Sequence, residues 1–386
     1  MSPTIRHMLH CERHVRRPAQ RFPYEETSRQ TKPYYGQTPG SSPVPFQGAP
    51  LMFFGLPVPG FGTVVRVATV VVGVVAAMPT RTGDLRSRPA PARDYPVAIA
   101  RAFAQQKIDD SVAVPQGRSI VLTHGHRVSR AVVLLHGFTD SPRQFAELAD
   151  SLYAQGDNVY VPRLPHHSER GGDVSRLAAV TAEGLRDFAD DATDIATGLG
   201  DSVTVVGLSA GATVAAWIGQ NRHDVQRVVL IAPAFQVTHV PSFFERALVN
   251  LGSRGPNVTR RSAPDTTQPD LAPGVATKGV AQVFRLGIAT RRLADDRPPG
   301  ANDLIFLLNA NDRTVKPGPA LDLAKQWWTR GANVVVYAFP DSLRLPHNVM
   351  EAAKRGGNSA AVFPSLEALA HGRAPPAWAA QRKTTW

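Results

Sequence analysis

The sequence has very little cysteine. Cys11 is the only one among 386 residues, which excludes an intramolecular disulfide and a cysteine-based metal cage. The twelve histidines do not form a metal site in place of the cysteines. His124 and His126, and the adjacent His166 and His167, lack Cys or carboxylate partners at the spacing of metal ligands. We interpret these histidines as residues of polar turns, and we expect no metal and no cofactor.

The sequence also lacks the signatures of nucleic-acid binding. It carries a formal net charge of +12, but it has no zinc-finger spacing and no aromatic-basic repeat. The positive charge is uneven, because residues 1–100 hold 12 Lys and Arg against 5 Asp and Glu. This distribution is typical of an N-terminal sorting feature combined with a solvated surface. We therefore expect no nucleic-acid partner.

The beginning of the chain has no sustained apolar period. Residues 1–50 are instead rich in Pro, Arg, Gln, Ser and Gly. Such a composition buries too little apolar surface to offset the entropy lost on folding. We predict that residues 1–60 form a disordered, basic region that carries no chemistry.

An apolar segment follows at residues 61–78. Its densest part, Val67–Ala77, is 11 residues long, which suits a secretory signal and is short for a membrane-spanning helix. Val75 and Ala77 supply small residues for a signal peptidase, so export is our first expectation. An uncleaved membrane anchor, with Arg66 reaching the interface, is the second. Both place the folded domain outside the cytoplasm and allow membrane association through residues 61–78.

Residues 1–50 ahead of a signal are unusual, because a signal normally begins a chain. Met52 is therefore an alternative start for a shorter product. After the apolar segment, residues 79–96 are rich in Pro and Arg. We predict that they form a flexible linker to a folded domain at residues 97–372, which would survive removal of everything before residue 97.

The region from residue 97 onwards alternates apolar strand runs with helical patterns. Such alternation is typical of an α/β protein with a mostly parallel sheet and helices on both of its faces. The predicted strands are Ala131–Leu135, Asn158–Val161, Ser202–Val206, Arg227–Ile231, Leu304–Leu308 and Asn333–Phe339. The predicted helices are residues 142–155, 181–198, 210–221 and 319–330. Residues 373–386 are expected to form a tail.

The interval 236–300 breaks this rhythm. It contains eight Arg, scattered Pro and Gly, and short amphipathic pieces. Because it is inserted between two strand and helix units, we predict a cap over the site. Its aromatic residues Phe243, Phe244 and Phe284 could line an apolar pocket, although packing within the cap is the simpler interpretation. The arginine excess is typical of a solvated surface, although anionic substrates or interfaces would also suit it.

A strand, a tight turn and a helix pattern follow one another at residues 202–221. The sequence SVTVVGLSAG contains a G-x-S-x-G string, which is a weak signal alone and a stronger one between a strand and a helix. Gly207 and Gly211 lie two residues before and after Ser209, where the absence of Cβ avoids clashes with the neighbouring strand and helix. Ser209 is therefore the candidate nucleophile.

A second motif follows the first strong strand and reads LLHGFTDSP at residues 134–142. Acyl transfer develops negative charge on the former carbonyl oxygen, so it requires two backbone N–H groups aimed at one point. We predict that the N–H groups of Phe138 and Ala210 form this oxyanion hole. We interpret His136 as a structural residue that orders the turn.

These motifs, together with an acid after a late strand and a histidine near the end, resemble the α/β-hydrolase superfamily. The most similar branch contains bacterial carboxylesterases and monoacylglycerol lipases. The resemblance covers roughly residues 128–356, excluding the cap. It implies an α/β-hydrolase fold with a small helical cap inserted late, and the chain order nucleophile, acid, histidine.

That order leaves few candidates for the acid and the histidine. Asp312 lies just beyond a buried strand, above the carboxyl end of the sheet, whereas Asp303 precedes the same strand and would lie at the opposite end. Asp341, after the next strand, remains an alternative acid. His347 follows the last strand and precedes a helix pattern, where members of this superfamily carry their catalytic histidine. His371 lies in a Gly- and Pro-rich stretch and fits less well.

The combined pattern predicts a serine hydrolase that cleaves carboxylic esters, a carboxylesterase or lipase, through an acyl-enzyme on Ser209. His347 would take the Ser209 proton, and Asp312 would hold the tautomer of the imidazole. The expected partner is a small-molecule ester or lipid. An acyltransferase or small-peptide hydrolase would use the same triad, and a non-catalytic binding protein could use the same scaffold.

Overall fold

The computed structural model describes residues 52–53, 56–57, 61–83, 85–238, 240–261, 274–350 and 359–376. The chain divides into two compact units, Met1–Pro59 and Gly60–Trp386. In the first unit, β1 (Met52–Phe53) pairs antiparallel with β2 (Leu56–Pro57). The rest of the region predicted to be disordered lies outside the described residues, as does most of the predicted tail.

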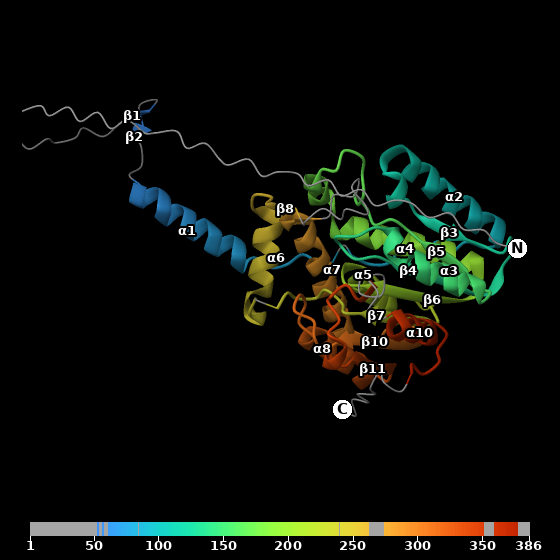
Figure 1. Cartoon of the computed structure of the whole chain (residues 1–386). Coiled ribbons are helices and arrows are strands. Elements are labelled where there is room, and N and C mark those ends of the chain that lie inside the picture. The colour runs from blue at the N-terminus through green and yellow to red at the C-terminus, as the bar shows by residue number, and fades with distance from the viewer. Residues whose placement is uncertain are drawn as a thin grey trace, which may run out of the picture. The chain divides into compact units, whose positions relative to one another are not determined.

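The second unit is built on a seven-stranded sheet (Figure 1). Its strands are β3 (Ile120–Leu122), β4 (Val128–Leu135), β5 (Asn158–Val161), β6 (Gly200–Leu208), β7 (Arg227–Ile231), β10 (Asp303–Asn309) and β11 (Asn333–Phe339). The spatial order is β11-β10-β7-β6-β4-β5-β3, and only the edge strand β3 runs antiparallel to its neighbour. The predicted mostly parallel sheet is confirmed, and three of its predicted strands have the observed bounds.

Alternating side chains along the strands divide the core into two layers. On β4, Ala131, Val133 and Leu135 face one layer, and Val132 and Leu134 face the other, because successive side chains of a strand point to opposite faces. Helices α4 (Ala182–Leu199), α5 (Ala210–Asn221), α7 (Thr277–Asp296) and α8 (Gly318–Thr329) cover the first face. Helices α3 (Ala146–Ala154) and α10 (Ser359–Ala370) cover the second.

The segment between residues 79 and 94, here called the strap, packs on the domain. Leu85 is 1% exposed and belongs to the same core as α4 and α5. Its carbonyl oxygen accepts a hydrogen bond of 3.0 Å from Nε1 of Trp217 on α5. The strap then leads directly into α2 (Tyr95–Val112), whose first turn is capped by the Asp94 carboxylate. The prediction of a flexible linker is therefore wrong here, and the packed domain begins before residue 97.

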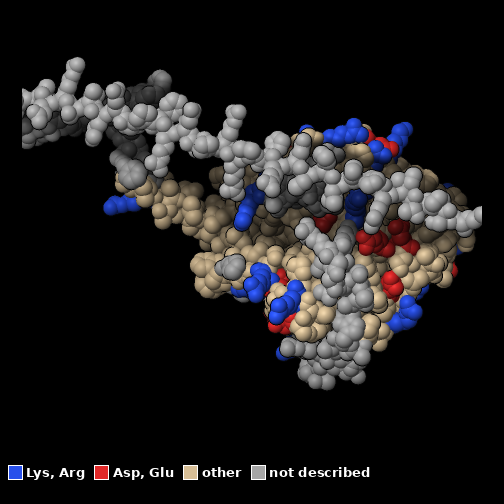
Figure 2. Space-filling view, in the orientation of Figure 1, with Lys and Arg blue, Asp and Glu red and all other residues tan. Residues whose placement is uncertain are grey.

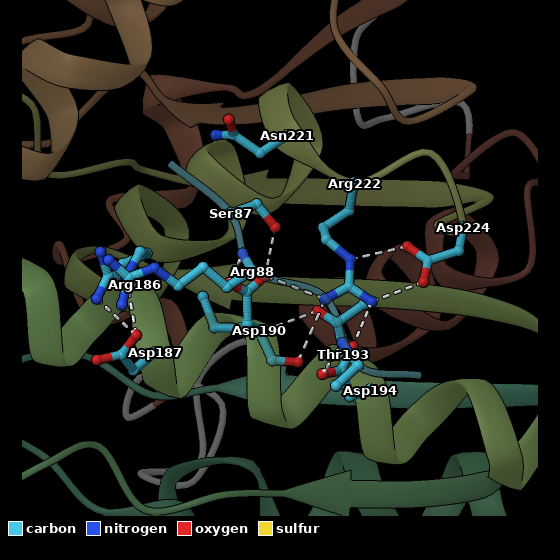
Figure 3. Close-up of polar contacts among 12 residues, drawn as sticks. Ser87, Arg88, Arg186, Asp187, Asp190, Thr193, Asp194, Asn221, Arg222 and Asp224 are labelled. Atoms are coloured by element: carbon cyan, nitrogen blue, oxygen red, sulfur yellow. Dashed lines mark hydrogen bonds and ion pairs between the residues drawn. The ribbon is translucent and has the colours of Figure 1, made fainter. Parts of the chain in front are cut away.

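A buried arginine lies beneath the strap (Figure 3). Arg222, which follows α5 and is 1% exposed, donates hydrogen bonds to Asp190 (3.1 Å) and Asp194 (2.6 Å) on α4. It also donates two hydrogen bonds to Asp224, at 2.9 and 2.6 Å. Removing one partner from such a cluster would leave a buried charge without compensation, so the cluster fixes α4 against the end of α5.

The same carboxylates hold the backbone of the strap. Asp190 accepts hydrogen bonds from the Ser87 hydroxyl (2.6 Å) and the Arg88 N–H (2.7 Å). Asp194 accepts one from the Ala90 N–H (2.7 Å). Hydrogen bonds to charged groups are stronger than those between neutral groups, which explains why a Pro- and Arg-rich segment is ordered on this surface.

Residues 236–300 form a smaller cap than predicted. Helix α6 (Glu245–Arg254) is followed by an antiparallel pair, β8 (Thr259–Arg261) and β9 (Gly274–Ala276). Helix α7, in contrast, is buried along much of its length. A Cβ on Gly287 would lie 2.8 Å from the Phe235 ring, so α7 belongs to the helical layer of the domain. We use the word cap below for residues 240–261.

The predicted sorting segment forms α1 (Phe61–Ala77), which contacts α6 (Figure 1). In the part of the chain that the structure describes, no helix combines the length and the apolar character needed to cross a membrane. Export through this segment stays a prediction.

We expect Leu85→Ala to lower the free energy of unfolding by about 2 to 5 kcal/mol, because it leaves a cavity in the core. Denaturant unfolding of the full chain, followed by tryptophan fluorescence, measures the change. Ile108→Ala, at a half-exposed position of α2, is the matched control and should change stability by less than about 1 kcal/mol. Equal, small effects of both substitutions would show that the strap is a loose linker.

Candidate active site

Ser209 lies in the sharp turn between β6 and α5. Its backbone has a φ of 56° and a ψ of -114°, a conformation that residues other than glycine rarely adopt. The turn is held by a hydrogen bond from the Ser209 N–H to the Ile231 carbonyl (2.9 Å), and by one from the Ala234 N–H to the Ser209 carbonyl (3.1 Å). Strain of this kind persists where the surroundings fix it, commonly at functional sites.

The two glycines of the motif allow the backbone to approach closely at this turn. A Cβ on Gly207 would lie 2.3 Å from the carbonyl oxygen of Gly211. A Cβ on Gly211 would lie 2.0 Å from the carbonyl oxygen of Leu135 on β4. Any larger residue at either position would displace α5 from the sheet, and Ser209 would move with it.

The loops after β10 and β11 bring two further predicted residues to Ser209. Nε2 of His347 lies 2.8 Å from Oγ of Ser209, and Nδ1 of the same ring lies 2.7 Å from Oδ2 of Asp312. An ionised carboxylate only accepts hydrogen bonds, so Nδ1 carries the proton of the neutral ring and Nε2 is free to accept one. The structure thus brings Ser209, His347 and Asp312 together in the predicted order of contacts.

The Asp312 side chain is 5% exposed, and its carboxylate is held by three hydrogen bonds. Its Oδ1 accepts hydrogen bonds from the N–H groups of Thr314 (2.8 Å) and Val315 (3.1 Å). Burial raises the pKa of Asp312. The hydrogen bond to His347, the positive charge that this ring carries when protonated and the two backbone donors outweigh burial and hold the pKa of Asp312 below its usual value. Asp312 is therefore an ionised acceptor for the histidine.

The other candidates lie elsewhere. Asp341 is exposed in a short 3-10 helix after β11. Asp303 begins β10 and pairs with Arg227 at the opposite end of the strand. Nε2 of His371, the residue after α10, donates a hydrogen bond to Oδ2 of the buried Asp157 at 2.7 Å. The geometry therefore favours Asp312 over the alternative acids.

The two predicted oxyanion residues come from different segments of the chain. Ala210 is the first residue of α5, so its N–H has no partner within the helix. Phe138 follows β4 in a turn that His136 holds, since Nδ1 of His136 donates to the Gly137 carbonyl (2.8 Å) and Nε2 accepts from the Leu164 N–H (3.0 Å). The structural interpretation of His136 is borne out by both contacts.

A second histidine supports the same turn. Nε2 of His167 lies 2.8 Å from the Phe138 carbonyl oxygen, and Nδ1 lies 2.9 Å from that of Pro165. Burial lowers the pKa of His167 to about 4, although the two carbonyl oxygens act in the opposite direction. A neutral ring has one N–H and donates to one of these carbonyls, whereas a protonated ring donates to both. His166 and Ser168 flank it with φ values of 63° and 54°. Sequence reasoning placed His167 in a polar turn but missed its contact with the oxyanion segment.

Gln144 joins the turn that carries Phe138 to the loop that carries His347, a link that no local sequence pattern indicated. Its Oε1 accepts from the Gly137 N–H (2.8 Å), and its Nε2 donates to Oδ1 of Asn348 (3.1 Å). Asn348, next to His347, donates in turn to Oδ2 of Asp140 (3.2 Å). This circuit fixes the distance between the two loops.

Among the described residues, no group of three or more His, Cys, Asp or Glu side chains could hold a metal ion.

This fold and site define a class of protein. The chain belongs to the alpha/beta hydrolase family, whose model matches residues 132–381, more than half of the sequence. It is similar to the thermostable monoacylglycerol lipase of Bacillus sp. (strain H-257), with 26% identity over 199 residues that span 49% of this chain and 73% of that lipase.

Two solved structures are also similar. One, from work on the metagenome-derived lipolytic enzymes LipS and LipT, has a TM-score of 0.46 and 17% identity, covering 59% of this chain and 89% of the other. The monoacylglycerol lipase of Paleococcus ferrophilus has a TM-score of 0.43 and 16% identity, covering 57% of this chain and 88% of the other.

We expect Gln144→Ala and Asn348→Ala each to lower kcat for hydrolysis about tenfold, equivalent to about 1.4 kcal/mol, with little change in KM. Because both residues belong to one circuit of hydrogen bonds, the double variant should be scarcely slower than the slower single variant. Gln155→Ala, on the exposed end of α3, is the control. Fully additive losses, or losses matched by a lower melting temperature, would contradict this positioning role.

Proposed function

We propose that the protein is a serine hydrolase that cleaves carboxylic esters, as a carboxylesterase or lipase, through an acyl-enzyme on Ser209. The observation that carries the proposal is the continuous chain of short contacts from Ser209 through His347 to the ionised Asp312. The relationship to a monoacylglycerol lipase supports an ester of a fatty acid as the substrate class.

In the first half of the reaction, Oγ of Ser209 attacks the ester carbonyl carbon while Nε2 of His347 takes the hydroxyl proton. The imidazolium that forms is stabilised by Asp312. The carbon–oxygen bond of the ester then breaks, and His347 returns the proton to the departing alcohol. The acyl group remains on Ser209.

In the second half, water takes the place of the alcohol. His347 removes one proton from the water as its oxygen attacks the acyl carbon, and then returns a proton to Oγ of Ser209 as the acid leaves. In both halves the former carbonyl oxygen becomes negative. In this proposal the N–H groups of Phe138, after β4, and of Ala210, the first residue of α5, stabilise this charge.

We expect the full chain to hydrolyse p-nitrophenyl esters, and Ser209→Ala to lower kcat on the order of a thousandfold or more. The melting temperature should stay close to that of the wild type, because the substitution removes one oxygen atom. Ser202→Ala, at the other end of β6, is the matched control and should keep full activity. The same esters from acetate to decanoate report the preferred acyl length. Full activity of Ser209→Ala would overturn the proposal.

A further inference from the structure

The cap carries an exposed aromatic pair. Phe243 is 80% exposed and Phe244 is 50% exposed, and their ring centroids lie 4.3 Å apart. Leu248, one helical turn after Phe244 on α6, is also exposed, and this spacing places both on one face of the helix. Single exposed apolar residues are common, whereas a contiguous group marks an interaction site.

Helix α1 extends this apolar character. Six of its valines are exposed: Val65, Val67, Val70, Val71, Val72 and Val74. Nδ2 of Asn250 on α6 donates to the carbonyl oxygens of Met78 (2.6 Å) and Ala76 (3.3 Å), so the end of α1 is joined to the cap. Figure 2 shows α1 as a nearly uncharged surface.

The exposed charges of α1 and the cap all have one sign. They are Arg66, Arg246, Arg254, Arg260 and Arg261. The acid in these two segments, Glu245, is largely buried and pairs with Arg291 of α7. Apolar side chains accompanied only by arginine are typical of segments that lie in the interface of an anionic membrane.

We propose that the cap docks on an anionic lipid surface, with Phe243, Phe244 and Leu248 entering the interface and the arginines contacting lipid phosphates. The positive charge of the cap argues against two other binding partners for this surface. A second copy of the cap would present the same positive charges. Residues 1–59 also carry a positive balance, with seven Lys and Arg against three Glu. An anionic lipid complements both the apolar and the cationic parts.

The test measures binding rather than hydrolysis, so it does not depend on the proposed function. The full chain carrying Ser209→Ala is sedimented with phosphatidylcholine vesicles that contain or lack phosphatidylglycerol. We expect binding to the anionic vesicles and weaker binding at high salt, because salt screens the arginines. Adding Phe243→Ser and Phe244→Ser should lower the partition coefficient at least about tenfold, through the loss of buried apolar area.

Two further variants serve as a control for the phenylalanines and as a test of the arginines. Phe103→Ser removes a half-exposed phenylalanine of α2, outside the cap, and should leave binding unchanged. Arg246→Gln combined with Arg260→Gln and Arg261→Gln should abolish the preference for anionic vesicles.

Equal binding of the double phenylalanine variant and its parent would assign any membrane binding to α1 alone and overturn the proposal for the cap. Equal binding to neutral and anionic vesicles would overturn the role of the arginines. A chain that binds neither vesicle, including one that binds only an acidic protein, would overturn the proposal altogether.

Discussion

The close approach of α5 to β4 at the Ser209 turn is the constraint on which the site depends. It requires Gly207 and Gly211, since a Cβ at either would overlap a carbonyl group, and it holds Ser209 at a positive φ. In that conformation the hydroxyl meets Nε2 of His347 at 2.8 Å, and the first N–H of α5 stays outside the helical hydrogen bonds. One local backbone geometry therefore positions both the proposed nucleophile, Ser209, and a proposed oxyanion donor, the Ala210 N–H.

Much of this site could be predicted because its signals are local. β-Branched runs and period-two alternation marked the buried strands, and G-x-S-x-G between a strand and a helix marked Ser209. Parallel strands then bring their carboxyl ends to one edge, so residues just after β10 and β11 had to lie near Ser209. That topological rule, rather than any motif, favoured Asp312 over Asp303.

What the sequence did not reveal depends on contacts between distant residues. The strap is ordered by Asp190 and Asp194, about a hundred residues further along the chain, and its own composition is that of a linker. Gln144 and Asn348 are separated by 204 positions, so no local period links them. The sequence pattern of α7 is amphipathic, and this pattern alone does not distinguish a helix of the cap from a helix of the layer that covers a sheet.

The most direct measurement of the central claim is covalent labelling of the folded full chain with a fluorophosphonate, followed by peptide mapping. Such a probe reacts with a serine hydroxyl that a neighbouring base activates. We expect one modified residue, Ser209, with labelling strongly slowed in His347→Ala. Labelling of a different serine, or a folded protein that does not react at all, would contradict it.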